Sequence, residues 1–236
     1  MRVLAIDTAS NVATAAVSSG GVILGERILN FKKTHSQRLM PMVSELLAEL
    51  ELKASDIDLF AAATGPGSFT GLRIGVATIK ALAHAAGKPA AGVSTLAGLA
   101  YNLPFCEHII VPIMDARRNR VYTASYIWDE DGFKELSGAE VITIEECAAS
   151  CGELLDTVLV GDGVPIYREL LTERLGDRAH FAPASAMMQR ASSIAMIAED
   201  MAGRGETLHY NELVPFYINK SQAEQEYEKN HQGEKI

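Results

Sequence analysis

The sequence predicts an α/β protein built from two similar mixed-sheet domains in tandem. Three observations lead to this class. Short apolar runs alternate with amphipathic helical stretches along the 236 residues. The order strand–strand–strand–helix–strand–helix occurs twice, and in both halves the first strand ends in an aspartate, Asp7 or Asp115. Long-period duplication of a mixed unit indicates two related α/β domains.

The first half opens with VLAIDT, a buried-strand pattern that contains Asp7. VATAAVSS and VILGERILN follow as two strands, separated by the turn pair Gly20-Gly21. The spacing of apolar residues then predicts an amphipathic helix over about 36–50. IDLFAAAT is a further short strand, and a glycine-containing helix follows it to about Gly87.

The second half repeats this order. HIIVPIMD is a strand ending in Asp115, and NRVYTASYIW and FKELS are two more. A helix is expected over about 144–155, then the apolar run TVLVGDG, and PIYRELLTERLG begins another helix. The stretch 189–203 is expected to be a last helix.

A three-strand meander plus a strand reached through a helix suggests a mixed sheet with helices on its faces. By analogy, this is the ribonuclease-H-like arrangement of the actin and sugar-kinase superfamily. The predicted domains are 1–104 and 105–218, with the boundary in NLPFCE. The polar tail 219–236 is expected to be disordered.

Composition and charge limit the classes of function that are expected for this chain. The chain is 48% hydrophobic and 22% charged, with a formal charge of -9, so it repels phosphate backbones and is not expected to hold a nucleic acid alone. Its start, MRVLAIDTAS, lacks signal-peptide architecture, and no run approaches the roughly 20 apolar residues of a bilayer span. Three cysteines fit a reducing compartment. We expect a cytoplasmic protein with no membrane segment.

The most distinctive segment is TGPGSFTGLRIGVATIKALA. Its Gly-Pro-Gly is predicted to form a tight turn, and Ser68 is a natural helix N-cap. Gly71 and Gly75 then share one helical face. Because each costs about 1 kcal/mol relative to alanine, a close contact must compensate. That contact is either with the protein's own sheet or preceding helix, or it accompanies a partner helix on the neighbouring face.

Familiar catalytic motifs do not fit this segment. A P-loop would need Lys and Ser/Thr after Gly71, where Leu72 and Arg73 stand. The dinucleotide-binding fingerprint requires glycine where Thr70 stands, and a nucleophile elbow requires glycine where Pro66 stands.

Other candidate chemistry is sparse. The pair Cys147 and Cys151 is half of a zinc site, and packing is the preferred interpretation. Asp7 and Asp115 would serve a phosphotransferase as magnesium ligands or base, or would simply cap turns. A basic cluster stands out in the acidic chain: it would meet RNA phosphate or an acidic partner, or form a solvated turn, and its residues are Arg117, Arg118 and Arg120.

Six motifs carry a family resemblance: AIDTA at 5–9, HSQRLMP at 35–41, GPGSFTGLRIG at 65–75, GVSTLAGLA at 92–100, IMDARRNRVY at 113–122 and VGDG at 160–163. Through them the chain resembles the bacterial TsaB (YeaZ) family. The resemblance implies a non-catalytic subunit required for threonylcarbamoylation of the adenosine beside the anticodon in tRNAs that read codons beginning with A. It implies docking to the TsaD catalytic subunit and its activation, with the TsaE ATPase as third subunit.

The same resemblance implies no catalytic residue, cofactor or metal in this chain, and tRNA contact only through the complex. ATP and a metal ion are expected in the partner subunits. In TsaD a His-x-x-x-His helix after a short Gly-Val strand holds the metal. In this sequence Thr95 and Leu99 stand at those two positions, and neither replaces an imidazole.

The resemblance further implies that the helices over about 36–50 and 68–87 dock onto TsaD, or form a homodimer when TsaD is absent. The predicted partner-interface residues are Leu39, Met40, Val43, Leu46, Leu47, Phe69, Gly71, Leu72, Arg73, Gly75, Val76 and Ile79. Leu46→Asp or Gly71→Leu is expected to abolish the heterodimer without unfolding the domain. Three alternatives stay open at this point: a small-molecule kinase or ATPase, a metallopeptidase-like protein, and a plain dimeric scaffold.

Overall fold

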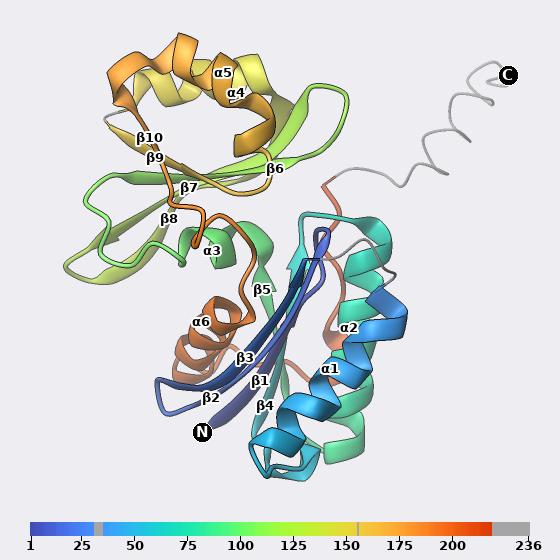
Figure 1. The fold of residues 1–236 in the computed structure, drawn as a ribbon. Coiled ribbons are helices and arrows are strands. Elements are labelled where there is room, and N and C mark those ends of the chain that lie inside the picture. The colour runs from blue at the N-terminus through green and yellow to red at the C-terminus, as the bar shows by residue number, and fades with distance from the viewer. Residues whose placement is uncertain (31–34, 155, 219–236) are drawn as a thin grey trace, which may run out of the picture.

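The computed structural model describes residues 1–30, 35–154 and 156–218 and contains two five-stranded mixed sheets (Figure 1). The first sheet has the order β3-β2-β1-β4-β5 and the second β10-β9-β6-β7-β8, so both follow one topology. In the first sheet β1–β3 form an antiparallel meander, and β4 and β5 join it in parallel. The strands are β1 (Arg2–Asp7), β2 (Val12–Ser19), β3 (Val22–Asn30), β4 (Leu59–Gly65), β5 (Ala90–Ser94), β6 (Ile109–Asp115), β7 (Arg120–Asp129), β8 (Gly132–Thr143), β9 (Thr157–Val160) and β10 (Ala179–Phe181).

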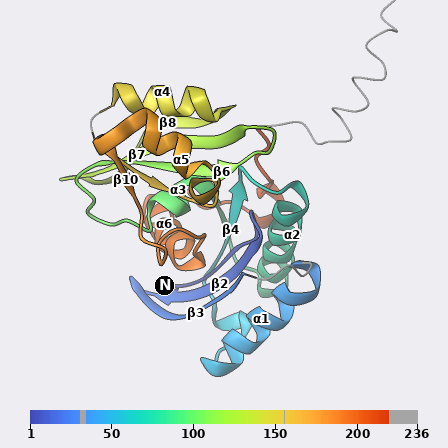
Figure 2. The same ribbon diagram turned by 45° about the horizontal axis from the view of Figure 1, so that its top comes forward.

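Helices cover the sheets in layers (Figures 1 and 2). α1 and α2 lie on one face of the first sheet and α6 on the other, whereas α4 and α5 cover the second sheet on its side away from the first domain. The short α3 lies between the two domains. The predicted tandem ribonuclease-H-like fold is confirmed. The helices are α1 (His35–Glu49), α2 (Phe69–Ala86), α3 (Thr95–Ala100), α4 (Ile144–Glu153), α5 (Val164–Leu175) and α6 (Ala191–Gly203), with short 3-10 turns at Ala54–Asp56, Gly176–Arg178 and Tyr210–Glu212.

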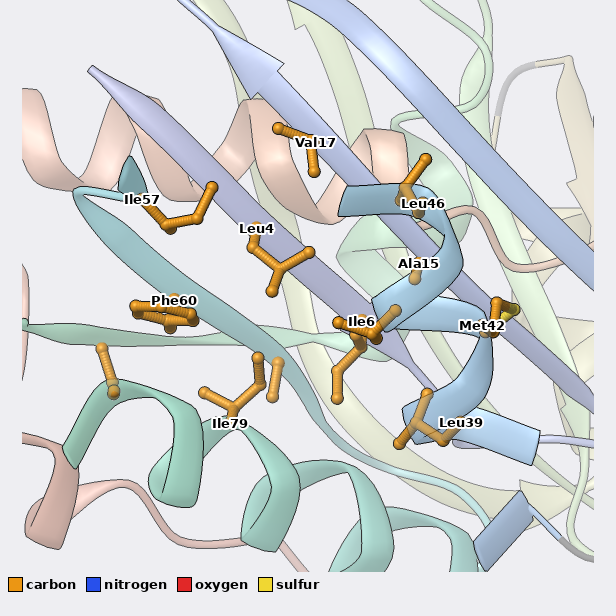
Figure 3. Packing of buried hydrophobic residues seen from close by; sticks show 14 of the residues in the cluster. Leu4, Ile6, Ala15, Val17, Leu39, Met42, Leu46, Ile57, Phe60 and Ile79 are labelled. Carbon is orange, nitrogen blue, oxygen red and sulfur yellow. The ribbon is translucent and has the colours of Figure 1, made fainter. Parts of the chain in front are cut away.

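The core of the first domain lies between its sheet and the pair α1 and α2. Figure 3 shows Leu39, Met42 and Leu46 of α1 on the side of the helix that faces the strands, near Ile6 and Ala15. Each of the five is at most 3% exposed. The apolar stripe of α1 therefore covers the chain's own sheet.

The sequence pattern did not predict every element. β5 and α3 lie in the stretch 90–100, whose small residues give no clear period, and β10 has only three residues. β8 is also much longer than the predicted FKELS. The two halves therefore match more closely in structure than in sequence pattern.

The last helix belongs to the first sheet, although the sequence placed it in the domain 105–218. Ala191, Ile194 and Ala198 of α6 are fully buried in one cluster with Val3 and Ala5 of β1. The reason is complementarity, because this face of the first sheet is rich in alanine and admits a helix with small side chains.

After α6 the chain runs back along the first domain as a strap, residues 205–218. Leu208 and Ala90 exchange two backbone hydrogen bonds of 2.8 and 2.9 Å. Leu213 is 1% exposed within the first domain's core, and the Phe216 amide donates to the Thr64 carbonyl at 2.7 Å. The strap thus follows the sheet edge and ends beside the start of α2. The predicted disordered tail, 219–236, lies outside the described residues.

None of the helices in the described part of the chain combines the length and the apolar character needed to cross a membrane.

Candidate functional site

A cavity of about 520 Å³ lies between the two domains. Both of its long walls are built at the carboxyl ends of strands, where β1 and β6 turn into β2 and β7. In open α/β sheets ligands bind in such crevices. The lining residues are Ala9, Ser10, Asn11, Pro66, Gly67, Ser68, Phe69, Thr70, Met114, Asp115, Ala116, Arg117, Tyr122, Asp162, Phe216, Tyr217 and Ile218.

Asp115 and Asp162 line the cavity, and the buried Asp7 interacts electrostatically with Asp162. Asp7 is 1% exposed, and its Oδ1 accepts a hydrogen bond of 2.8 Å from the Ala9 amide. Burial raises the pKa of Asp7 to about 7, and the nearby charge of Asp162 adds to the increase. Burial also raises the pKa of Asp162, with a further increase from the charge of Asp115. The sequence pointed to Asp7 and Asp115 at the cleft but missed Asp162, which stands in the short VGDG motif.

These carboxyl groups do not make a metal centre by themselves. Within residues 1–30, 35–154 and 156–218, no three His, Cys, Asp or Glu side chains come together as a metal site. Cys147 and Cys151 are both buried in the core between α4 and the second sheet, in agreement with the preferred packing interpretation.

The basic cluster forms the β6–β7 turn at the cavity. Arg117, Arg118 and Asn119 all have left-handed backbone angles, with φ of 63°, 53° and 60°. A left-handed conformation costs roughly 1–2 kcal/mol for a residue with a side chain. Two hydrogen bonds hold the turn. The Arg117 backbone amide donates to Asp115 Oδ1 at 2.9 Å, and the Ala116 backbone amide donates to the Arg120 carbonyl at 2.9 Å. Its arginines are exposed, and Arg117 lines the cavity.

Another part of the cavity lining is aromatic. Phe69 of α2 and Tyr217 of the strap have ring centroids 4.8 Å apart. The Arg73 guanidinium lies 3.9 Å from the Phe69 centroid, and its Nε donates to Tyr217 Oη at 3.0 Å. Phe216 is 53% exposed beside them. Sequence reasoning missed the role of the strap, because only tertiary structure brings 215–217 to the start of α2.

The predicted partner-interface residues fall into two groups. Met40 and Arg73 are exposed, and Phe69 is half-buried, so these three lie where another molecule could touch them. The other nine are buried within the chain, so in this structure none of them presents its side chain to a partner: Leu39, Val43, Leu46, Leu47, Gly71, Leu72, Gly75, Val76 and Ile79. The helical spacing of the apolar residues among them therefore reflects burial against the chain's own first sheet.

The glycine face of α2 packs on the end of β1. A Cβ at Gly71 would overlap the Thr8 carbonyl oxygen, and one at Gly75 would lie 2.5 Å from Thr8 Oγ1. The Thr8 hydroxyl donates to the Gly71 carbonyl at 2.7 Å. The compensating close contact is therefore with the chain's own sheet. Gly71→Leu and Leu46→Asp would both disturb the fold, so our expectation that they test docking alone was wrong.

The two positions that correspond to metal ligands lie on α3. Thr95 and Leu99 are both fully buried between the domains. Thr95 Oγ1 has no hydrogen-bond partner in the described part of the chain, and Leu99 has no donor atom. These residues do not fit a metal ion.

A family model and two curated proteins are similar to this chain over most of its length. A family model described as "TsaD: tRNA N6-adenosine threonylcarbamoyltransferase" matches residues 22–227. The tRNA threonylcarbamoyladenosine biosynthesis protein TsaB of Bacillus subtilis is 31% identical over 225 residues, covering 95% of this chain and 96% of that protein. The protein of the same name from Escherichia coli is 32% identical over 231 residues, covering 94% and 96%.

A solved structure is similar over nearly its whole length. It is described as an uncharacterized protein with similarity to peptidase YEAZ from Pseudomonas aeruginosa, and it aligns with a TM-score of 0.78 and 29% identity. The match covers 92% of this chain and 99% of that one. On these grounds, the chain belongs to the TsaB (YeaZ) family, within the wider family that the TsaD model describes.

Proposed function

We propose that this chain is the non-catalytic subunit required for threonylcarbamoylation of the adenosine beside the anticodon, and that it docks to and activates a TsaD-type catalytic subunit. The names of its relatives and the matching family model support this role. One observation carries the argument. In the enzyme family the helix corresponding to α3 would hold a catalytic metal. In this chain α3 carries Thr95 and Leu99 at the two ligand positions, and both are fully buried. The scaffold of the enzyme family is present without its metal-binding side chains.

The docking surface we propose is the outward side of α1 and α2. These helices lie side by side on one face of the first sheet (Figure 1). Their exposed positions include Met40 and Ser44 on α1 and Ala77 and Ala81 on α2. Small and apolar side chains allow a second pair of helices to approach closely. The same surface would serve a homodimer when the catalytic subunit is absent.

The first experiment is reconstitution with purified TsaD, TsaE, tRNA, ATP and a threonylcarbamoyl-adenylate source, with and without this chain. We expect modification only in its presence, and no ATP hydrolysis or metal retention by the chain alone. We expect ATP to bind to TsaE and the metal ion to TsaD. Equal modification without the chain would favour an unrelated scaffold. Catalysis by the chain alone would favour a kinase, ATPase or metallopeptidase-like protein.

Docking is tested by Met40→Glu and Ala77→Arg, which place charge on the outward helix surface without entering the core. We expect each to weaken TsaD binding at least tenfold, because a charge is costly in a helix–helix interface. Ile166→Glu is the matched control, since Ile166 is 59% exposed on α5 in the other domain. Calorimetric titration measures the dissociation constant, and circular dichroism checks folding. Unchanged affinity in both folded variants would contradict this docking surface.

A further inference from the structure

The interdomain cavity has an aromatic wall and a cationic rim. The proposed docking surface on the outward side of α1 and α2 does not include Phe216, Tyr217 or Arg117. The aromatic wall is Phe69, Phe216 and Tyr217, and the cationic rim is Arg117 with its neighbour Arg118. Phe69, Phe216, Tyr217 and Arg117 line one cavity of about 520 Å³, which accommodates a nucleotide-sized group.

The aromatic wall is held rigidly. Tyr217 is fixed by its hydrogen bond from Arg73 Nε at 3.0 Å and by its contact with Phe69 at 4.8 Å between centroids. The backbone of Phe216 is fixed by the bond of its amide to Thr64. Yet Phe216 and Tyr217 remain 53% and 38% exposed. Exposed, preorganised rings beside an arginine are the surface on which unpaired bases stack.

The arginines of the cationic rim, Arg117 and Arg118, form no ion pair within the described part of the chain. Both arginines lie on a left-handed turn, in a chain whose formal charge is -9. Such a turn persists only where the surrounding structure holds it, and strained turns of this kind cluster at ligand sites.

Two carboxylates in the cavity lining favour RNA over DNA. Asp115 and Asp162 line the cavity and would repel a phosphate placed next to them. Their carboxylates can instead accept hydrogen bonds from ribose 2′-hydroxyl groups, which DNA lacks. These residues would take sugars at the carboxylates, bases on the aromatic rings and phosphates at the arginines.

We propose that this cavity binds unpaired nucleotides of RNA, with bases on Phe216 and Tyr217 and phosphates at Arg117 and Arg118. The inference rests on the proposed function, because it assigns this chain a direct contact with the tRNA substrate. It commits to RNA rather than to an acidic protein partner, since aromatic stacking surfaces and 2′-hydroxyl acceptors serve nucleotides.

The test uses the complex reconstituted with TsaD, because the isolated chain has a formal charge of -9 and repels RNA at long range. A labelled anticodon stem-loop RNA is titrated at several salt concentrations by fluorescence anisotropy, with a DNA of the same sequence in parallel. The double variant Arg117→Ala/Arg118→Ala should weaken RNA binding about tenfold or more and reduce the salt slope by about 1.4, or about 0.7 per lost phosphate contact. Arg174→Ala, an exposed arginine on α5, is the matched control.

The variant Phe216→Ala/Tyr217→Leu should weaken RNA binding about fivefold or more with an unchanged salt slope, because stacking is not ionic. Ultraviolet cross-linking should attach RNA to peptides containing 114–122 or 215–217. RNA binding unaffected by both variants, or cross-links confined to TsaD, would overturn the proposal. Equal affinity for DNA, or saturation by free AMP or ATP without RNA binding, would also overturn it. Variants that no longer bind TsaD but still bind RNA normally would overturn the proposal as well, because the arginine rim would then contact TsaD rather than RNA.

The readouts separate this inference from the proposed function. Heterodimer formation is measured first for every variant. If the heterodimer and tRNA modification persist while RNA binding does not depend on the cavity, only the RNA inference fails. If no heterodimer forms with the wild-type chain, the proposed function itself fails.

Discussion

At the scale of single residues, Asp7 shows how burial raises the pKa of a carboxyl group. It ends β1, is 1% exposed, and has a pKa raised to about 7 chiefly by burial. A group whose pKa is raised on folding binds its proton more tightly in the native state. Ionising it therefore lowers stability as pH rises from about 4 toward 7.

The first prediction is that Asp7→Asn is more stable than wild type at pH 8 and close to it near pH 4. Asparagine is isosteric, and its Oδ1 can still accept from the Ala9 amide. The difference should grow between pH 4 and 7, then level off at about 2–4 kcal/mol. Urea unfolding at pH 4, 6 and 8 measures it. A stability difference that does not change with pH would contradict a neutral buried carboxyl.

At the scale of elements, α2 shows how glycine sets a packing distance. Ser68 caps its start, accepting from the Gly71 amide, and Gly87 ends it with φ 64°. Between these ends, Gly71 and Gly75 let the helix backbone approach Thr8 at the end of β1. The helix propensity lost at two glycines is offset by this contact.

The second prediction is that Gly71→Ala destabilises the protein by about 1–3 kcal/mol, although alanine is the better helix former. The added methyl would overlap the Thr8 carbonyl, which belongs to the backbone and cannot rotate away. Gly203→Ala is the control, because Gly203 lies in α6 with nothing within 4 Å of an added Cβ. Thermal unfolding compares the two. A Gly71→Ala protein as stable as the Gly203→Ala protein would show that the contact relaxes.

At the scale of the whole molecule, the two domains are not independent along the chain. The first sheet uses residues from both ends of the sequence, with α6 on one face and the strap along its edge. Asn102 ties these parts together: its Nδ2 donates to the Met188 carbonyl at 2.8 Å, and its Oδ1 accepts from Ser193 Oγ at 2.6 Å. A boundary near residue 104 therefore separates the two sheets, but the segments on its two sides do not form independently folding domains.

The third prediction is that a chain ending at Gln189 fails to fold its first domain, even though every strand of that domain is present. Without α6, the face of the sheet that carries Val3 and Ala5 would be exposed. A chain ending at Ile218 is the control, because it keeps α6 and the strap. Circular dichroism and limited proteolysis measure folding. A stable, protease-resistant 1–189 chain would show that the first domain folds by itself.

The sequence alone determined most of the elements and their order (β5, α3 and β10 excepted), the duplication, the tandem fold class, the N-cap at Ser68 and the glycines of α2, because local periodicity and turn chemistry carry this information. It also supplied the motifs that identify the family. Only the tertiary structure decided what each apolar face meets. The stripe containing Leu46 covers the chain's own sheet, and α6 crosses to the first domain. The strap delivers Tyr217 to the interdomain cavity. Periodicity records that a face is buried but not against which partner, since that depends on shape complementarity between segments far apart in the chain.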